Sequence, residues 1–185
     1  MLEELNLFPI KVYRTNLVLD NDAMRTKLYE LKNANNHDLS WHSSPWQSSR
    51  DLHILMEFKN LCDRIGEIIR DIFKKESQIL QMWGSVYAQY DFNNLHNHPP
   101  LNGSYTDNPL WAGVYYLDTS KNSAGLNIHS HVNLTDTQIF YPIPGDLYIF
   151  NSTTYHSVNP NLDNHDRNCI AFNLEIKSKP FTTLN

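Results

Sequence analysis

The spacing of apolar residues changes from a helical period to a strand period near Lys75. Before that position, two segments carry apolar residues every three or four positions; after it, apolar and β-forming residues alternate. Helices followed by several short strands are typical of an α+β domain that is mainly β. The chain has 185 residues, enough for one domain with a sizeable core and too few for two comfortable ones. We therefore expect a single domain over residues 1–185.

The first 80 residues predict a strand and two supporting helices. Leu7–Tyr13 alternates apolar and polar positions, which predicts a strand of the main sheet that ends before Asn16. Residues 20–22 supply helix N-caps, and a first amphipathic helix should follow through Lys32. A longer helix is expected over 55–74, with an apolar face that packs on a sheet. That face would consist of Leu55, Phe58, Cys62, Ile65, Ile69 and Ile72.

Two other patterns complete the expected architecture. Residues 33–49 have no regular period and predict an ordered loop. Beyond them, glycine and proline divide residues 81–177 into short β segments. Strands are expected over 79–86, 87–92, 110–117, 125–132, 145–150 and 168–176. Such strands after supporting helices fit a double-stranded β-helix, also called a jelly roll.

Composition excludes several classes of partner. The net charge is −5 and the basic residues are interspersed among acidic ones, which argues against binding nucleic acid or an anionic membrane surface. No apolar run approaches the roughly 20 residues that a membrane-spanning helix needs. The first residues lack the basic start of a signal peptide, and Cys62 and Cys169 lie in apolar stretches, as reduced buried thiols do. We expect a soluble, cytoplasmic protein.

A pair of histidines, His96 and His98, follows the β-rich segment that begins at Ile79. If that strand continues, the two side chains project to the same side and can bind one metal ion. A third candidate ligand, His156, follows the strand expected over 145–150. Two ligands from one strand end and a third from a distant strand would suit a metal site inside a jelly roll.

Arg167 lies eleven residues beyond His156, at the start of a strand that is otherwise apolar. A permanently charged guanidinium in such a strand indicates a bound anion, which it would hold through paired hydrogen bonds. The alternative is a surface ion pair with Asp163 or Asp166. We favour the anion because the strand that follows is so apolar.

These motifs, in this order, resemble those of the iron(II) and 2-oxoglutarate-dependent oxygenases. The resemblance covers roughly 83–176 and rests on the histidine pair, Trp111–Asp118, Pro144-Gly145-Asp146 leading to His156, and Arg167–Asn173. It is strongest to a small group of 2-oxoglutarate oxygenases whose sequences read His-x-His-Pro, Ser-Gly-Val-Tyr-Tyr and Arg-x-x-x-Ala-Phe-Asn. The fold it implies is the double-stranded β-helix.

The resemblance also implies site residues and an activity. His96, His98 and His156 would bind Fe(II), and Arg167 would bind the far carboxylate of the cosubstrate 2-oxoglutarate. Tyr116 matches a tyrosine that hydrogen-bonds the same carboxylate, whereas Tyr115 would point away into the packing. Tyr90 and Asn173 are further candidates for lining the cosubstrate pocket. The implied reaction couples oxidative decarboxylation of 2-oxoglutarate to hydroxylation of a small-molecule or peptide substrate, which the sequence does not identify.

One feature departs from the family pattern, because the usual ligand set is His-x-Asp/Glu followed by a distant histidine. His98 stands at the carboxylate position. The nearest carboxylates that could replace it are Asp91 and Asp107, and we rank both below His98. His129 and His131 form a second His-x-His pair, which we interpret as polar side chains on a solvated or cavity-facing side of a strand. If this pair lined the pocket, it would contact substrate rather than metal. The other histidines considered, His42, His53 and His165, we assign to the surface.

Two further functions remain open on the sequence alone. One is a cupin-like three-histidine metal dioxygenase that does not use 2-oxoglutarate. The other is a jelly-roll binding protein that has no catalytic activity.

Overall fold

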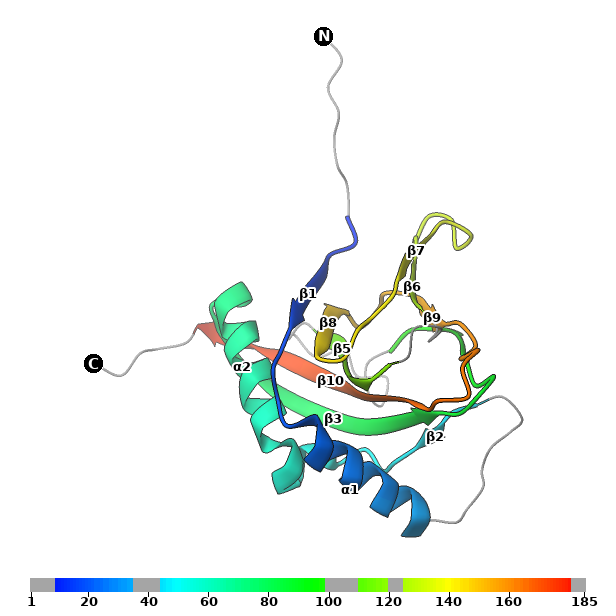
Figure 1. Ribbon diagram of the computed structural model, residues 1–185. Helices are drawn as coiled ribbons and strands as arrows, with labels where there is room; N and C mark the ends of the chain where they lie inside the picture. Colours follow the sequence, from blue (N-terminus) through cyan, green and yellow to red (C-terminus); the bar gives the residue numbers. More distant parts are fainter. Residues whose placement is uncertain (1–8, 35–43, 99–109, 120–124, 181–185) are drawn as a thin grey trace.

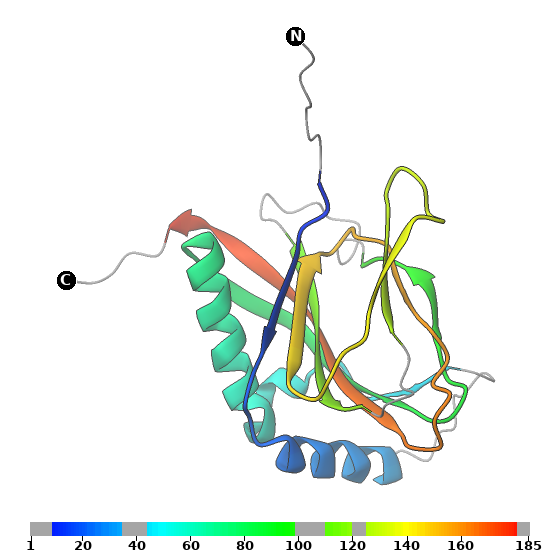
Figure 2. The ribbon, with the colours of Figure 1, turned by 45° about the horizontal axis from the view of Figure 1, so that its top comes forward.

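The computed structural model describes residues 9–34, 44–98, 110–119 and 125–180. Two antiparallel sheets face one another, and two helices cover the outer face of the larger sheet (Figure 1). Figure 2 shows the same layers from another side, with the smaller sheet opposite the helices. The structure is therefore mainly β with N-terminal helices, as the sequence predicts.

The larger sheet has six strands in the order β1-β8-β5-β10-β3-β2. Its longest members, β3 and β10, pair with each other in the middle of the molecule (Figure 1). The strands are β1 (Val12–Asn16), β2 (Trp46–Gln47), β3 (Lys75–Tyr87), β5 (Leu110–Asp118), β8 (Asp146–Asn151) and β10 (Arg167–Pro180).

The smaller sheet has four strands in the order β4-β9-β6-β7. They are β4 (Asn93–His96), β6 (Leu126–His129), β7 (Thr137–Phe140) and β9 (His156–Val158). Neighbouring strands in this sheet pair antiparallel throughout. Two facing antiparallel sheets of this kind form the predicted double-stranded β-helix.

The helices α1 (Asn21–Ala34) and α2 (Lys59–Phe73) lie where the sequence predicts them. The Asp20 carboxylate accepts a hydrogen bond from the Ala23 backbone N–H at 3.2 Å, as a helix N-cap does. Two short 3₁₀ helices, η1 (Leu52–Ile54) and η2 (Met56–Phe58), precede α2. The second helix therefore begins at Lys59, four residues later than predicted.

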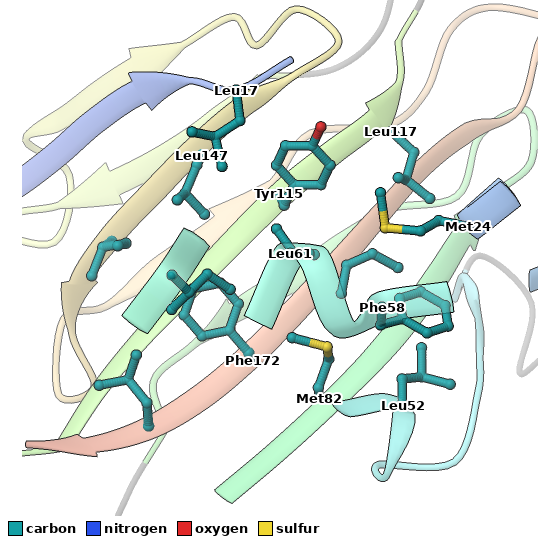
Figure 3. Close-up of a cluster of buried hydrophobic side chains, with 14 of the residues drawn as sticks. Leu17, Met24, Leu52, Phe58, Leu61, Met82, Tyr115, Leu117, Leu147 and Phe172 are labelled. Carbon is teal, nitrogen blue, oxygen red and sulfur yellow. The ribbon is translucent and has the colours of Figure 1, made fainter. Parts of the chain in front are cut away.

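A first hydrophobic core fills the space between the helices and the larger sheet. Figure 3 shows Leu61 of α2, and Phe58 just before it, in the same cluster as Met82 and Phe172 of the sheet. The buried face of α2 contains Leu61, Ile65 and Ile69. Cys62 was predicted to belong to this buried face, but it is only partly buried, and the neighbouring Leu61 is buried instead.

A second hydrophobic core lies between the two sheets. It joins residues of the larger sheet to residues of the smaller one, and its buried members are Tyr87, Ala112, Tyr116, Leu126, Ile128, Tyr148, Phe150 and Cys169. Tyr115 belongs instead to the first core, and its hydroxyl donates to Asn21 Oδ1 at 2.7 Å. Neighbouring residues of β5 thus face opposite layers, as a strand requires.

Some predicted boundaries differ from the structure. The first strand begins at Val12 rather than Leu7, and residues 1–8 lie outside the described part. Most of the predicted loop over 33–49 also lies outside it, although β2 occupies its end. The two strands expected over 79–92 are one strand that ends at Tyr87. Among the described residues, no helix is long and apolar enough to cross a membrane.

Candidate functional site

Three histidines converge at one edge of the space between the sheets. His96 is the last residue of β4 and lies directly opposite His156, the first residue of β9, while His98 follows two positions after His96. The ring centroids are 4.2 Å apart for His96 and His156, 5.0 Å for His98 and His156, and 5.4 Å for His96 and His98. One ligand atom from each ring lies within 4.8 Å of the others.

The position of His98 in this cluster does not result from continuation of the strand, which the sequence suggests. The strand β4 ends at His96, so His98 does not continue it. Its backbone N–H donates to the carbonyl oxygen of Ser152, in the turn after β8, at 2.8 Å. This contact between distant parts of the chain, rather than strand alternation, brings His98 beside His96.

Each of the three imidazoles donates a hydrogen bond from Nδ1. The acceptor of His96 is the Asn94 carbonyl oxygen at 2.7 Å, and that of His156 is the Thr154 carbonyl oxygen at 2.9 Å. His98 donates to Asn173 Oδ1 at 2.6 Å. An oxygen that can only accept requires the proton to be on Nδ1, which leaves the Nε2 lone pair available in a neutral ring.

The surroundings of two rings favour this neutral form. Burial, together with the nearby His96, lowers the pKa of His156 to about 3. Burial also lowers the pKa of His98 from its usual value, and His96 contributes in the same direction. Both imidazoles are therefore neutral at pH 7, which is the state that binds a metal ion.

The donor set fits a divalent transition metal. Three imidazoles that lie close together, each with Nδ1 hydrogen-bonded to an oxygen, are the arrangement that metal-binding histidines use. Imidazole suits iron, zinc, copper and nickel, and three protein ligands leave coordination positions open for other molecules. Within the described ranges, no other group of three histidine, cysteine or acidic side chains is placed to hold an ion.

A cavity of about 70 Å³ adjoins the histidines, several times the ~10–15 Å³ that a single water needs. Alternate residues of β10 face it, namely Arg167, Cys169 and Ala171, and their cross-strand partners on β3 are Tyr87, Ser85 and Trp83. The rest of the lining comes from β2, β5, β8, the smaller sheet and the segment after β4: Gln47, Asn93, His96, His98, Gly113, Val114, Tyr116, Leu126, Phe150, His156 and Val158.

Arg167 is the most unusual group in this lining. Its side chain is 1 % exposed, and its guanidinium carbon lies 3.9 Å from the centre of the Tyr87 ring. Among the described residues that line the cavity, it is the one permanent charge, and none is a carboxylate. Arg167 is therefore not at the surface, where the alternative of an ion pair with Asp163 or Asp166 would place it.

Tyrosine hydroxyls accompany this guanidinium. Tyr116 lines the cavity and is 2 % exposed, and burial raises its pKa well above the usual value. Burial also raises the pKa of Tyr87, whose hydroxyl accepts a hydrogen bond from Asn93 Nδ2 at 2.8 Å. Both tyrosines are therefore neutral at pH 7 and retain a proton that can be donated to an anion.

Two predicted cosubstrate residues lie elsewhere. Tyr90 is in the turn after β3, with φ at 72° and 61 % of the residue exposed, so it lies outside the cavity, where Tyr87 takes its place. Asn173 faces the site side of β10 but contacts His98 rather than the part of the cavity near Arg167. Sequence reasoning missed Tyr87, Trp83 and Gln81, which only the pairing of β3 with β10 would have indicated.

The alternative metal ligands do not join the histidine cluster. Asp91 accepts a hydrogen bond from the Ala88 backbone N–H at 2.8 Å and lies outside the three-histidine group. Asp107 and His42 fall outside the described residues. His129 Nε2 lies 2.9 Å from Ser157 Oγ, and its Nδ1 lies 2.8 Å from the Leu134 carbonyl oxygen.

The remaining histidines vary in exposure. His131 is exposed, as expected, and 67 % of the His165 side chain is exposed. His53 is partly buried, although it was expected at the surface.

The sequence matches no protein-family model and no curated protein. Solved structures do match. SnoK, a non-heme alpha-ketoglutarate-dependent carbocyclase from nogalamycin biosynthesis, is 13 % identical with a TM-score of 0.72, over 89 % of this chain and 79 % of SnoK. HygX from Streptomyces hygroscopicus, crystallised with nickel, 2-oxoglutarate and hygromycin B, is 16 % identical with a TM-score of 0.66, over 89 % of this chain and 82 % of HygX.

A third similar structure is the viral collagen prolyl hydroxylase vCPH from Paramecium bursaria Chlorella virus-1, in complex with 2-oxoglutarate. It is 8 % identical with a TM-score of 0.65, over 90 % of this chain and 96 % of vCPH. The narrower resemblance, to sequences with a His-x-His-Pro motif, stays a prediction. The shared architecture establishes that this chain has the fold of the iron and 2-oxoglutarate-dependent oxygenases.

Proposed function

We propose that the chain is an Fe(II)- and 2-oxoglutarate-dependent dioxygenase that hydroxylates a small-molecule or peptide substrate. One observation carries the proposal: three clustered imidazoles and one buried guanidinium line the same cavity. The fold alone would not support this function, because a fold can hold many chemistries.

The three histidines would hold the iron. Their Nδ1–H groups are bound to oxygens of Asn94, Thr154 and Asn173, so the rings are oriented before any metal arrives. When bound, iron supplies the redox chemistry by which dioxygen oxidises the 2-oxo acid and the substrate. The protein would supply the binding and the orientation.

Arg167 would bind the carboxylate of 2-oxoglutarate that lies away from the metal. A guanidinium binds a carboxylate through two parallel hydrogen bonds, and in a buried site the pairing is selective for an anion. Tyr116 would donate a further hydrogen bond from its hydroxyl.

The charge of the ligand set also favours a dianionic cosubstrate. Three neutral imidazoles leave a bound divalent cation with its full charge of +2, whereas a carboxylate ligand would reduce it. The nearby guanidinium adds another positive charge. A 2-oxo dicarboxylate brings two negative charges to the same cavity and offsets most of this excess.

A second candidate is a three-histidine metal dioxygenase that does not use 2-oxoglutarate. The all-histidine ligand set favours it, because the carboxylate ligand usual in 2-oxoglutarate oxygenases is replaced by His98. It leaves the buried Arg167 without a function in the reaction. The two candidates differ in whether a 2-oxo dicarboxylate binds.

Thermal unfolding with ligands separates these candidates. With Mn(II) as a redox-stable substitute for iron, 2-oxoglutarate at 100 times its Kd should add about 2.7 kcal/mol of stability. For a chain of this size that corresponds to a rise in Tm of about 5–10 °C. Glutarate has the same length and both carboxylates but lacks the 2-oxo group, so it should give a smaller rise. A metal-dependent Tm with no response to 2-oxoglutarate would instead support the second candidate.

A further inference from the structure

His98 is held differently from the other two metal-binding histidines. His96 and His156 each donate from Nδ1 to a backbone carbonyl oxygen two residues earlier, in Asn94 and Thr154. His98 donates to the side-chain oxygen of Asn173, which is 75 positions away on β10. A backbone carbonyl has a fixed polarity, but a side-chain amide can rotate and present NH₂ instead of oxygen. The orientation of His98 therefore depends on what fixes this amide.

The next residue in the network fixes it. Asn173 Nδ2 donates to Gln81 Oε1 at 3.2 Å, and the two residues are direct cross-strand partners in the pairing of β10 with β3. With its NH₂ group committed to Gln81, the amide of Asn173 presents its oxygen to His98. A rotated amide would place NH₂ against the Nδ1–H of His98 and oxygen against oxygen at Gln81.

Arg50 in turn fixes the amide of Gln81. Its Nη1 donates to the same Gln81 Oε1 at 3.4 Å, and its guanidinium carbon lies 5.3 Å from the centre of the Trp83 ring. A guanidinium can only donate, so the oxygen of Gln81 is the atom that faces both Arg50 and Asn173. Trp83 also packs beside His98, with ring centroids 5.7 Å apart, and limits rotation of the imidazole.

We propose that Arg50, Gln81 and Asn173 form a positioning relay that holds His98 in the Nδ1–H tautomer, with Nε2 toward the metal. The relay would let a histidine act as the metal ligand at the position where the family pattern has a carboxylate. A nearby backbone carbonyl orients each of His96 and His156, whereas side chains from β3 and β10 would orient His98. The inference rests on the proposed function only for the identity of the metal. The tautomer itself is a property of the protein without metal.

The first test measures that tautomer. In protein labelled with ¹⁵N-histidine and free of metal at pH 7.5, long-range ¹H–¹⁵N correlations distinguish the two neutral forms of each ring. Wild type should show His98 as Nδ1–H, whereas Asn173→Leu should shift it toward Nε2–H and leave His96 and His156 unchanged. Asn173→Asp keeps an acceptor and should keep the Nδ1–H form. An unchanged His98 in Asn173→Leu would overturn the proposal.

The second test measures Co(II) affinity by calorimetry. Asn173→Leu should weaken binding about 10–100-fold, the usual cost of losing a group that orients a ligand histidine, and Asn173→Asp should restore it. Gln81→Met should weaken binding in the same direction while leaving the Asn173 side chain in place. The matched control is Gln78→Met on the same strand, whose Oε1 accepts from Lys177 Nζ at 2.8 Å, away from the site.

The outcomes separate the relay from the proposed function. Equal Co(II) affinity in wild type, Asn173→Leu and Gln81→Met would overturn the relay even if the protein proves to be an oxygenase. Conversely, a wild type that binds no Co(II) would contradict the proposed function, while the tautomer of His98 would still decide whether the relay exists.

Discussion

Replacement of Arg167 by methionine should reduce 2-oxoglutarate turnover by about 30-fold to a few thousand-fold. This range corresponds to the about 2–5 kcal/mol that is lost when one partner of a buried, hydrogen-bonded charge pair is removed. The loss should fall mainly on the KM for 2-oxoglutarate, because Arg167 would bind the cosubstrate rather than the metal. Succinate formation with Fe(II) under air, measured at several 2-oxoglutarate concentrations, gives the KM for 2-oxoglutarate and the turnover rate.

Two controls make this prediction specific to the far carboxylate. The first is 2-oxopentanoate, which has the 2-oxo acid group but no second carboxylate, and which wild type and Arg167→Met should use equally poorly. The second is Arg14→Met, which removes an arginine of the same sheet that pairs with Asp146 at 2.7 Å rather than lining the cavity. If Arg167→Met kept the wild-type preference for 2-oxoglutarate over 2-oxopentanoate, the assigned role of Arg167 would be wrong.

Replacement of His156 by alanine should weaken metal binding by more than about 100-fold. Loss of a group that merely orients a ligand already costs 10–100-fold, so loss of one of three ligands should cost more. His156 is the most informative of the three because it is buried, 6 % exposed, and its ring centroid lies within 5.0 Å of both other rings. Calorimetric titration with Co(II) or Mn(II) measures the change.

The matched control is His129→Ala. His129 belongs to the neighbouring strand β6 and contacts Ser157, the residue after His156, but it is not part of the three-histidine group. Its removal should leave metal affinity within about threefold of wild type, because hydrogen bonds outside a ligand set have small and local effects. A loss in His129→Ala equal to that in His156→Ala would place the metal elsewhere.

The layered architecture follows from local periodicity. The helical spacing that includes Met24, Leu28, Ile65 and Ile69 predicts both helices, and these residues are buried against the sheet. The strands β5, β8 and β10 were predicted within two residues of their starts. Burial on both faces makes such strands nearly continuous apolar runs, which a sequence shows clearly.

The short strands of the smaller sheet were harder to recognise. β4, β7 and β9 have only three or four residues each, and β7 is largely exposed, so its apolar pattern is weak. Their existence depends on pairing with neighbours in space, as β9 pairs with both β4 and β6. Local preferences do not contain this information.

The candidate site was predicted in part. The structure brings together His96, His98, His156, Arg167 and Tyr116, which the sequence analysis had selected. The reason given for His98 was incomplete, because its position depends on Ser152 and Asn173 from distant parts of the chain. Their roles in binding remain predictions.

Cross-strand register explains the residues that were misplaced or missed. Tyr90 was a candidate for lining the pocket, whereas the pairing of Arg167 with Tyr87 places a residue three positions earlier beside the cavity. The same pairing places Gln81 opposite Asn173. Register between strands about 90 residues apart is set by the whole sheet, so no short sequence window reveals it.

The most direct test of the account is a crystal structure of the protein with Mn(II) and 2-oxoglutarate. We expect one metal ion on the Nε2 atoms of His96, His98 and His156, with the 2-oxo acid group on the metal and the far carboxylate within hydrogen-bond distance of Arg167. A metal bound at other residues, or a 2-oxoglutarate whose far carboxylate does not contact Arg167, would contradict it.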